Sequence, residues 1–210
     1  MITTINDTLQ TIAARHSVRN FQDRTVPAEL IETILTAANL APSAHNEQSW
    51  RFFVITGRTK KQLSELVSEK APDFSRSAAV LLRMAARSIA EAPVVIAVAN
   101  SGELMDHGMK LFSEDFKING ASNLMMLYDS FRTLEIQSSA AAVQNLLLAA
   151  TSCGLGAVWL GILYLIKNDV LALLGEPQGE FMAVIPIGYP GRETKSPNKK
   201  PLEKIVKYHS

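Results

Sequence analysis

Apolar residues recur every three or four positions in five stretches of the chain, the spacing expected of one face of an α-helix. In residues 27–40 the shared face is made by Ile31, Ile34, Leu35 and Ala38. Pro27 fits the first turn of this helix without losing a hydrogen bond, and Pro42 follows its end. Helices are therefore predicted over Thr3–Ala14, Pro27–Leu40, Thr59–Glu69, Ser75–Glu91 and Ile166–Leu174.

Short runs rich in aromatic and β-branched residues alternate with these helices and predict strands. One run, Pro93–Ala99, is almost continuously apolar, as expected of a central strand buried on both faces. The predicted strands are Trp50–Thr56, Pro93–Ala99, Ala157–Ile162 and Phe181–Ile187. Strands interleaved with helices indicate an α+β fold, a mixed α/β sandwich. Because 210 residues suffice for one large core, residues 1–210 are expected to form a single domain.

Two further stretches do not show a simple period. Ile136–Cys153 is predicted to be a long helix, apolar on almost every side, which must be enclosed in a core or at a subunit interface. Ser101–Glu135 is the least regular region, with large apolar residues at Met105, Met109, Phe112, Phe116, Met125, Met126, Tyr128 and Phe131. These side chains could line a pocket for an electron acceptor, since methionine repacks around differently shaped ligands, or they could cover the core.

Composition narrows the class of protein. A net charge of +1, from 21 basic and 20 acidic residues, argues against a nucleic-acid surface. Cys153 is the only cysteine, so no intrachain disulfide is possible and a cytoplasmic location is expected. Neither a secretory signal nor a membrane span is expected, because the first residues lack a basic-apolar pattern and Ala140–Ile166 is interrupted by polar and glycine residues.

Several kinds of active site lack the residues they need. The four histidines are scattered without Cys or acidic residues at ligand spacing, so no metal site is predicted. No Gly-x-Gly-x-x-Gly or Walker-type loop follows a strand, which argues against a Rossmann domain and a P-loop. Ser43 lacks the Gly-x-Ser-x-Gly context of a hydrolase nucleophile.

Two polar clusters carry most of the functional signal. Arg15, His16, Ser17 and Arg19 place two guanidiniums and a hydroxyl within five residues, which suits a phosphate-bearing ligand. The loop 42–48, with Pro42, Ser43, Ala44, His45, Asn46 and Gln48, offers short polar groups that could contact a flat heteroaromatic ring. A solvated basic loop is the alternative for the first cluster. Arg83 and Arg87, one turn apart on the predicted helix Ser75–Glu91, could contact a cofactor or lie on a solvated helix face.

These clusters and four later motifs together resemble the FMN-dependent nitroreductase family. The motifs run in the family's order from about Arg15 to Leu202: Arg15-x-Ser17-x-Arg19, Ala41-Pro42-Ser43-x-x-Asn46-x-Gln48-x-Trp50-x-Phe52, Gln144–Ala150, Gly154–Gly161, Ile187–Pro190 and Lys199–Leu202. Residues 101 to about 135 match no motif.

The resemblance implies an intertwined homodimer with one FMN at each end of the interface. Arg15, Ser17 and Arg19 would hold the phosphate and pyrimidine edge, His16 would contribute mainly backbone, and Lys199 would add charge at the phosphate, with Lys195 and Lys200 as alternatives. Pro42, Ser43, Ala44 and Asn46 would reach the ring from the partner chain. Gln48 also matches the motif, with a structural role in the loop as one alternative. Trp159, Leu160 and Gly161 would lie along the isoalloxazine with their N–H groups near N5 and O4, and the tail 190–210 would pack on the partner.

The chemistry implied is that of the flavin, so no catalytic side chain is expected. NAD(P)H would reduce it, and a nitroaromatic, quinone or related small-molecule acceptor would reoxidise it, in a ping-pong scheme. Other functions on the same scaffold remain open: an enone reductase, a reductive dehalogenase, a flavin-consuming synthase, or a flavin-binding protein without NAD(P)H turnover. The sequence identifies neither the acceptor nor a preference between NADH and NADPH.

Overall fold

A four-stranded antiparallel sheet forms the centre of the computed structural model, which describes residues 6–111, 121–192 and 196–209. Its strands are β1 (Trp50–Ile55), β2 (Val94–Asn100), β3 (Gly156–Ala157) and β4 (Glu180–Gly188), in the order β1-β2-β4-β3. β1 and β2 begin at opposite ends of the sheet, since Trp50 pairs with Asn100 and Ile55 with Val95. The predicted α+β class is confirmed.

The central strand β2 is buried along its whole length, as its continuous apolar run predicts. Its side chains alternate between two core clusters on opposite faces of the sheet: Val95, Ala97 and Ala99 on one, and Val94, Ile96 and Val98 on the other. This alternation follows from the two-residue repeat of a strand. The sheet is therefore covered on both faces.

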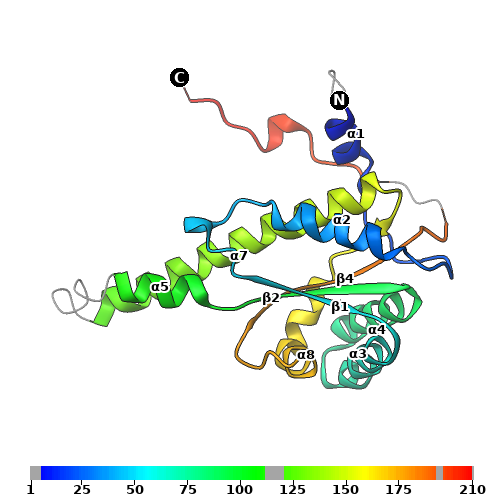
Figure 1. The fold of residues 1–210 in the computed structure, drawn as a ribbon, viewed down its shortest axis with the longest axis horizontal. Helices are drawn as coiled ribbons and strands as arrows, with labels where there is room; N and C mark the ends of the chain where they lie inside the picture. The colour runs from blue at the N-terminus through cyan, green and yellow to red at the C-terminus, as the bar shows by residue number, and fades with distance from the viewer. Residues whose placement is uncertain (1–5, 112–120, 193–195, 210) are drawn as a thin grey trace.

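Helices supply the two covering layers (Figure 1). One face carries α2 (Ala28–Asn39) and the long α7 (Ala121–Ser152); the other carries α3 (Gly57–Lys70), α4 (Arg76–Glu91) and α8 (Lys167–Leu174). The buried residues of α2 are Ile31, Ile34 and Ala38, three of the four positions that the period places on one face. The predictions of helices at 27–40, 59–69, 75–91 and 166–174 are confirmed to within two residues at each end.

The predicted strand Ala157–Ile162 is mostly wrong. Only Gly156–Ala157 forms β3, although the backbone N–H groups of Val158 and Leu160 still donate to β4 carbonyls at 3.4 and 2.9 Å. The chain then coils into the 3-10 helix η3 (Gly161–Ile166), which buries Leu163 and Ile166. At the edge of the sheet, apolar side chains are buried by coiling onto the α4 side rather than by a longer strand.

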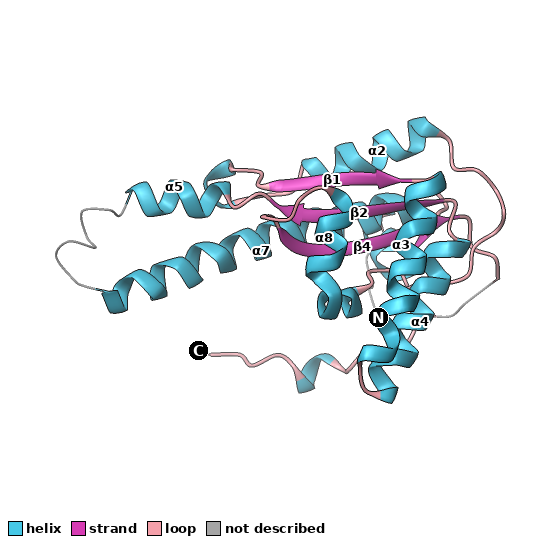
Figure 2. Cartoon of the chain, turned by 90° about the horizontal axis from the view of Figure 1, so that it is seen from below, coloured by secondary structure: helices cyan, strands magenta, loops and turns pink. Residues whose placement is uncertain are grey.

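The region 101–135 is also more regular than its sequence indicates. It holds α5 (Glu103–Leu111) and the first part of α7, which form a helical hairpin projecting beyond the sheet (Figure 2). Gly108 permits their close approach, because a Cβ at this glycine would lie 2.4 Å from the Phe131 ring. Phe112 and Phe116 lie outside the described residues.

A buried carboxylate on α7 holds the start of α5. The side chain of Glu135 accepts a hydrogen bond of 2.9 Å from the Leu104 backbone N–H, and the residue is 2% exposed. An anion is favourable at this place because the first N–H groups of a helix lack intrahelical partners. Burial nevertheless raises the pKa of Glu135, while bonds from Leu104 and Ser49 act in the opposite direction.

This raised pKa makes a testable contribution to stability. Because the folded state holds the Glu135 proton more tightly than the unfolded chain, the contribution is present at acidic pH and is lost as pH rises through the folded-state pKa. We expect the unfolding free energy of the native protein, relative to Glu135→Gln, to fall as pH rises from about 4 toward neutrality. Urea unfolding of both proteins across this range measures the difference. A flat or rising difference would contradict the assignment.

Both chain ends lie outside the layers (Figure 1). The helix α1 (Asp7–Ala14) is capped by Asn6, whose side chain accepts from Leu9 N–H at 2.9 Å, and it has no buried residues. Its predicted start at Thr3 lies outside the described residues. The described tail, 196–209, is exposed throughout and has one 3-10 turn, Leu202–Lys204. No helix in the described part of the chain is long and apolar enough to cross a membrane.

Candidate functional site

The first polar cluster is fixed along the β3 edge of the sheet. Ser17 forms a parallel bridge with Ala157, and the Val18 N–H donates to the Ala157 carbonyl at 3.0 Å. Farther along, Phe21 forms an antiparallel bridge with Pro190. Val18 and Phe21 are buried in the core on the α4 side, while Ser17 and Arg19 are exposed. The buried side chains of Val18 and Phe21 anchor the backbone, and the polar side chains of Ser17 and Arg19, which point the other way, stay accessible.

Glycines permit this close backbone approach. A Cβ at Gly156 would lie 2.7 Å from the Val18 side chain, and one at Gly191 would lie 2.3 Å from Asn20 Oδ1. Any larger residue at either position would push the Arg15–Phe21 segment away from the sheet. The glycines therefore help to place the basic cluster, a role not visible from their spacing.

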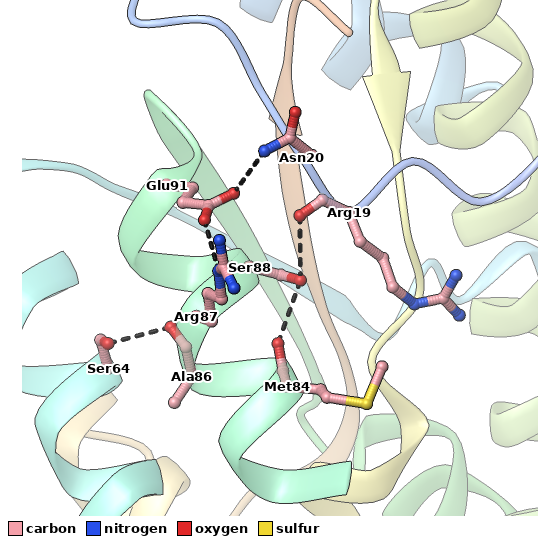
Figure 3. A network of polar contacts seen from close by, with 8 residues as sticks. All are labelled: Arg19, Asn20, Ser64, Met84, Ala86, Arg87, Ser88 and Glu91. Atoms are coloured by element: carbon pink, nitrogen blue, oxygen red, sulfur yellow. Dashed lines mark hydrogen bonds and ion pairs between the residues drawn. The ribbon is translucent and has the colours of Figure 1, made fainter. Parts of the chain in front are cut away.

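Helix α4 fixes the main chain of Arg19 but leaves its guanidinium without a carboxylate partner among the described residues (Figure 3). The Ser88 hydroxyl donates to the Arg19 carbonyl at 3.3 Å. The nearby carboxylate of Glu91 is engaged twice, by Arg87 Nε at 2.6 Å and by Asn20 Nδ2 at 3.1 Å. In Figure 3 the Arg19 side chain points away from this network. Its charge is thus available to a ligand.

Arg19 lies beside Trp159 and faces a cleft of about 280 Å³. Because the bridge between Ser17 and Ala157 is parallel, the residues two positions later in each segment, Arg19 and Trp159, lie next to each other. The cleft is also lined by Leu160, Gly161, Ile162 and three α4 residues, Leu81, Met84 and Ala85. Because Val158 and Leu160 point their N–H groups at β4, alternation turns the Trp159 N–H away from β4. The cleft therefore combines a cation and an apolar lining.

A second cleft of about 280 Å³ adjoins the first, since Arg19 and Met84 line both. It adds Arg87 and Arg192 to the lining. From the sequence pattern, Arg87 could be a solvated residue or a cofactor contact, and Arg192 belongs to no motif. The only signal for Arg192 is its place just after the turn that leaves β4, which brings it back toward Asn20 through the Gly191 N–H bond to the Asn20 carbonyl.

The other residues of the first cluster are close by in sequence. Arg15 and His16 are half-buried where the chain leaves α1, and His16 Nδ1 lies 2.9 Å from the Ala14 carbonyl oxygen. The Arg15 N–H closes α1 by donating to Thr11 O at 3.0 Å. Lys199 is exposed in the tail and Lys195 lies outside the described residues, so a phosphate role for either stays a prediction.

The second polar cluster forms a separate loop, next to α7. Ala44 N–H donates to Ser138 Oγ, and Gln48 N–H donates to Ser43 Oγ, both at 3.1 Å. The Gln48 amide donates to the Asn46 carbonyl at 2.9 Å. The Ser43 oxygen and the Gln48 side chain therefore shape the loop, whereas Pro42 and Asn46 are exposed.

This loop has unusual backbone geometry. His45, Asn46 and Gln48 have φ angles of 52°, 57° and 51°, in the left-handed region that residues with a side chain seldom adopt. Asparagine and histidine tolerate this region better than glutamine, and each such residue costs about 1–3 kcal/mol. Backbone strain of this kind is most frequent at functional sites. The residue types in the loop do not predict it.

The two clusters lie at opposite ends of the sheet in one chain. The loop precedes Trp50, at the start of β1, whereas Ser17 is level with Ala157, Ile187 and thus Val94, at the other end. The length of β1 separates these ends by about 17 Å. The loop also packs on the α7 face, and the Arg19 cleft opens on the α4 face.

The apolar residues of the hairpin divide into two groups. Phe131 is 5% exposed and packs between the helices, which supports the reading as core. Met125 and Met126 are 71% and 63% exposed and line an open groove on α7, so they do not cover the core. The alternative that they line a pocket for an acceptor stays a prediction.

Proteins of known family resemble this chain in sequence and in architecture. The sequence model of the nitroreductase family matches residues 12–189. A Methanothermobacter thermautotrophicus protein named as an NADH dehydrogenase/NAD(P)H nitroreductase is 34% identical, over 94% of this chain and 87% of its own. Iodotyrosine deiodinase of Nematostella vectensis is 26% identical, over 91% and 71%. A structure from Desulfovibrio desulfuricans, named as a nitroreductase in complex with FMN, has a TM-score of 0.69 and 27% identity over 99% of both chains.

Within the described ranges, no three His, Cys, Asp or Glu side chains are grouped as metal ligands would be.

Proposed function

The chain belongs to the nitroreductase family of oxidoreductases, and we propose that it uses FMN to pass electrons from NAD(P)H to nitroaromatic, quinone or related electrophilic acceptors. The observation that carries this proposal is the cleft in which Arg19 lies beside Trp159–Gly161. The FMN-bound relative supports it. The single cysteine fits a cytoplasmic location.

The residues of the cleft suit FMN in charge and shape. Arg15 and Ser17 would bind the phosphate, because a guanidinium offers paired donors to its oxygens. Arg19 would lie at the pyrimidine edge, where a cation stabilises negative charge on a bound ring and favours its reduction. Leu81 and Met84 would cover apolar ring surface, and the Trp159 N–H would donate to the ring edge.

Bound FMN would supply the redox chemistry, accepting a hydride from NAD(P)H and then passing electrons to the acceptor in a separate half-reaction. The protein's part is to bind and orient. Such a reaction needs no nucleophilic side chain, and Ser43 lacks the sequence context of one.

We propose that each site is completed by a second copy of the chain. The 42–48 loop lies about 17 Å from Ser17 along the sheet, too far to reach the same ring within one chain. A homodimer in which this loop crosses to the other subunit's cleft would bring Pro42, Ser43, Ala44 and Asn46 to the ring. Exposed apolar residues in the tail, Leu202, Ile205 and Tyr208 at 69%, 61% and 93%, fit a segment that packs on a partner.

In this dimer the acceptor would meet the hairpin of the subunit that provides the loop. α5 joins the loop directly, through Glu47 and His107, so loop and hairpin would approach the same flavin together. Met125, Met126 and Tyr128 then offer an adaptable apolar surface to an aromatic acceptor.

Reductive dehalogenation is the second candidate, favoured by the similarity to iodotyrosine deiodinase. Both functions would begin with NAD(P)H or another reductant reducing the flavin. Steady-state turnover with quinones, nitroaromatics and halogenated phenols distinguishes them by the acceptor that is consumed.

The purified protein is expected to be yellow and to bind FMN rather than FAD, because the cationic cluster suits one terminal phosphate and the sequence lacks a dinucleotide fingerprint. Heat-released cofactor should run as FMN on chromatography. The bound flavin should bleach on anaerobic addition of NADH or NADPH. Finding FAD, or no flavin after reconstitution with FMN, would overturn the proposal.

A further inference from the structure

The left-handed loop has one side-chain link to the hairpin through a residue that the family motif leaves unspecified. Glu47 lies between Asn46 and Gln48, the two left-handed residues on either side of it, and itself has φ −68°. Its carboxylate Oε1 lies 2.5 Å from His107 Nδ1 on α5. Glu47 is the more enclosed partner, with 22% of its side chain exposed against 48% for His107.

This contact fixes the loop at its most constrained point. A residue between two left-handed positions has no freedom to move without changing both neighbours. Holding the Glu47 carboxylate therefore holds Asn46, whose own side chain stays exposed.

We propose that Glu47 and His107 are a positioning pair that sets Asn46 against the flavin ring and couples this contact to the position of α5. The inference rests on the proposed function, in which Asn46 reaches FMN in the other subunit's cleft. The His107 Nδ1–H donates to the Glu47 carboxylate, a charge-assisted hydrogen bond that is stronger than one between two neutral groups. A ligand that moves the hairpin would thereby move Asn46.

A neighbouring ion pair provides the matched control. Arg51 and Glu103 also join the sheet to α5, at 2.7 Å, but Arg51 belongs to β1 and not to the loop. Breaking either pair loosens α5, whereas only the Glu47–His107 pair holds Asn46. The Ser101 N–H bond to the Ser49 carbonyl and the Glu135 bond to the Leu104 N–H stay intact in both cases.

The test measures FMN affinity by titrating apoprotein and records the visible spectrum of the bound flavin. His107→Ala should weaken FMN binding roughly three- to tenfold and shift the flavin absorption band. His107→Asn, whose amide nitrogen can occupy the place of Nδ1, should restore most of both. Glu103→Ala should leave affinity and spectrum as in the native protein, and Glu47→Ala combined with His107→Ala should be no worse than either alone.

Each alternative result has a defined meaning when unfolding curves show the variants to be folded. A native affinity and spectrum in His107→Ala overturns the positioning role, as does an equal loss in Glu103→Ala, which would reduce the pair to general support of α5. If His107→Ala does not fold, Glu47→Ala gives the same comparison. A native protein that takes up no FMN would instead refute the proposed function, and this inference with it.

Discussion

Replacing Arg19 with alanine is expected to weaken FMN binding about ten- to a hundredfold, the largest loss from any single side chain of the cleft. The Arg19 guanidinium has no carboxylate partner among the described residues, so nothing in the free protein competes for its charge. Its main chain is held independently by Ser88 and by the β3 edge. The substitution should therefore remove a ligand contact without moving the segment.

Fluorescence titration of apoprotein with FMN measures this loss. Arg58→Ala is the matched control, an exposed arginine at the start of α3 and outside both clefts. Arg19→Lys should fall between the native protein and Arg19→Ala, because it keeps the charge and loses the paired donors. Equal affinities of Arg19→Ala and Arg58→Ala for FMN would mean that Arg19 belongs to a solvated loop and does not contact the cofactor.

The regular elements could be predicted because their burial follows one period. β2 is buried at every position and apolar from Val94 to Ala99 because both faces are covered, and α2 repeats its apolar residues on one side because only that side is covered. The hairpin of α5 and α7 could not be predicted because its burial follows no single period. Its contact uses Gly108 against Phe131, and a glycine within polar sequence gives no periodic signal.

The ends of elements at the sheet edge depend on information that a local pattern lacks. Apart from Gly161, the residues from Val158 to Ile162 are β-branched, aromatic or leucine, which favours a strand. In the structure they lie at the outer edge, where Leu163 and Ile166 gain more burial by turning under the sheet. Whether a segment lies at an edge is fixed by strand order, which only the complete fold determines.

The candidate site shows the same division. Arg15–Arg19 could be recognised because its residues are adjacent in sequence and match a motif. Arg87 and Arg192 join Arg19 only through packing, across about seventy and one hundred and seventy positions of sequence. The left-handed backbone at Gln48 is equally hidden, because glutamine is not a residue that predicts this conformation.

The second large effect concerns which subunit provides each half of the site. Arg15→Ala and Asn46→Ala chains are each expected to form dimers with two damaged sites. In a mixed dimer under the shared-site arrangement, one site collects both substitutions, and the other has native Arg15 and native Asn46. That dimer should recover up to about half of the native turnover, if its two sites act independently. The apolar residues of α7 are enclosed in the core of their own chain, whereas the exposed apolar residues of the tail favour a stable dimer for this experiment.

Turnover of NADH or NADPH by isolated mixed dimers is the most direct measurement of the shared site. The two variants carry different affinity tags, are refolded together, and are purified through both tags. Each variant homodimer must first be shown to be folded, dimeric and impaired. Recovery to about half of the native rate is the predicted result. No recovery above the impaired homodimers would mean that each subunit provides both Arg15 and Asn46 to its own site, and would contradict the shared site.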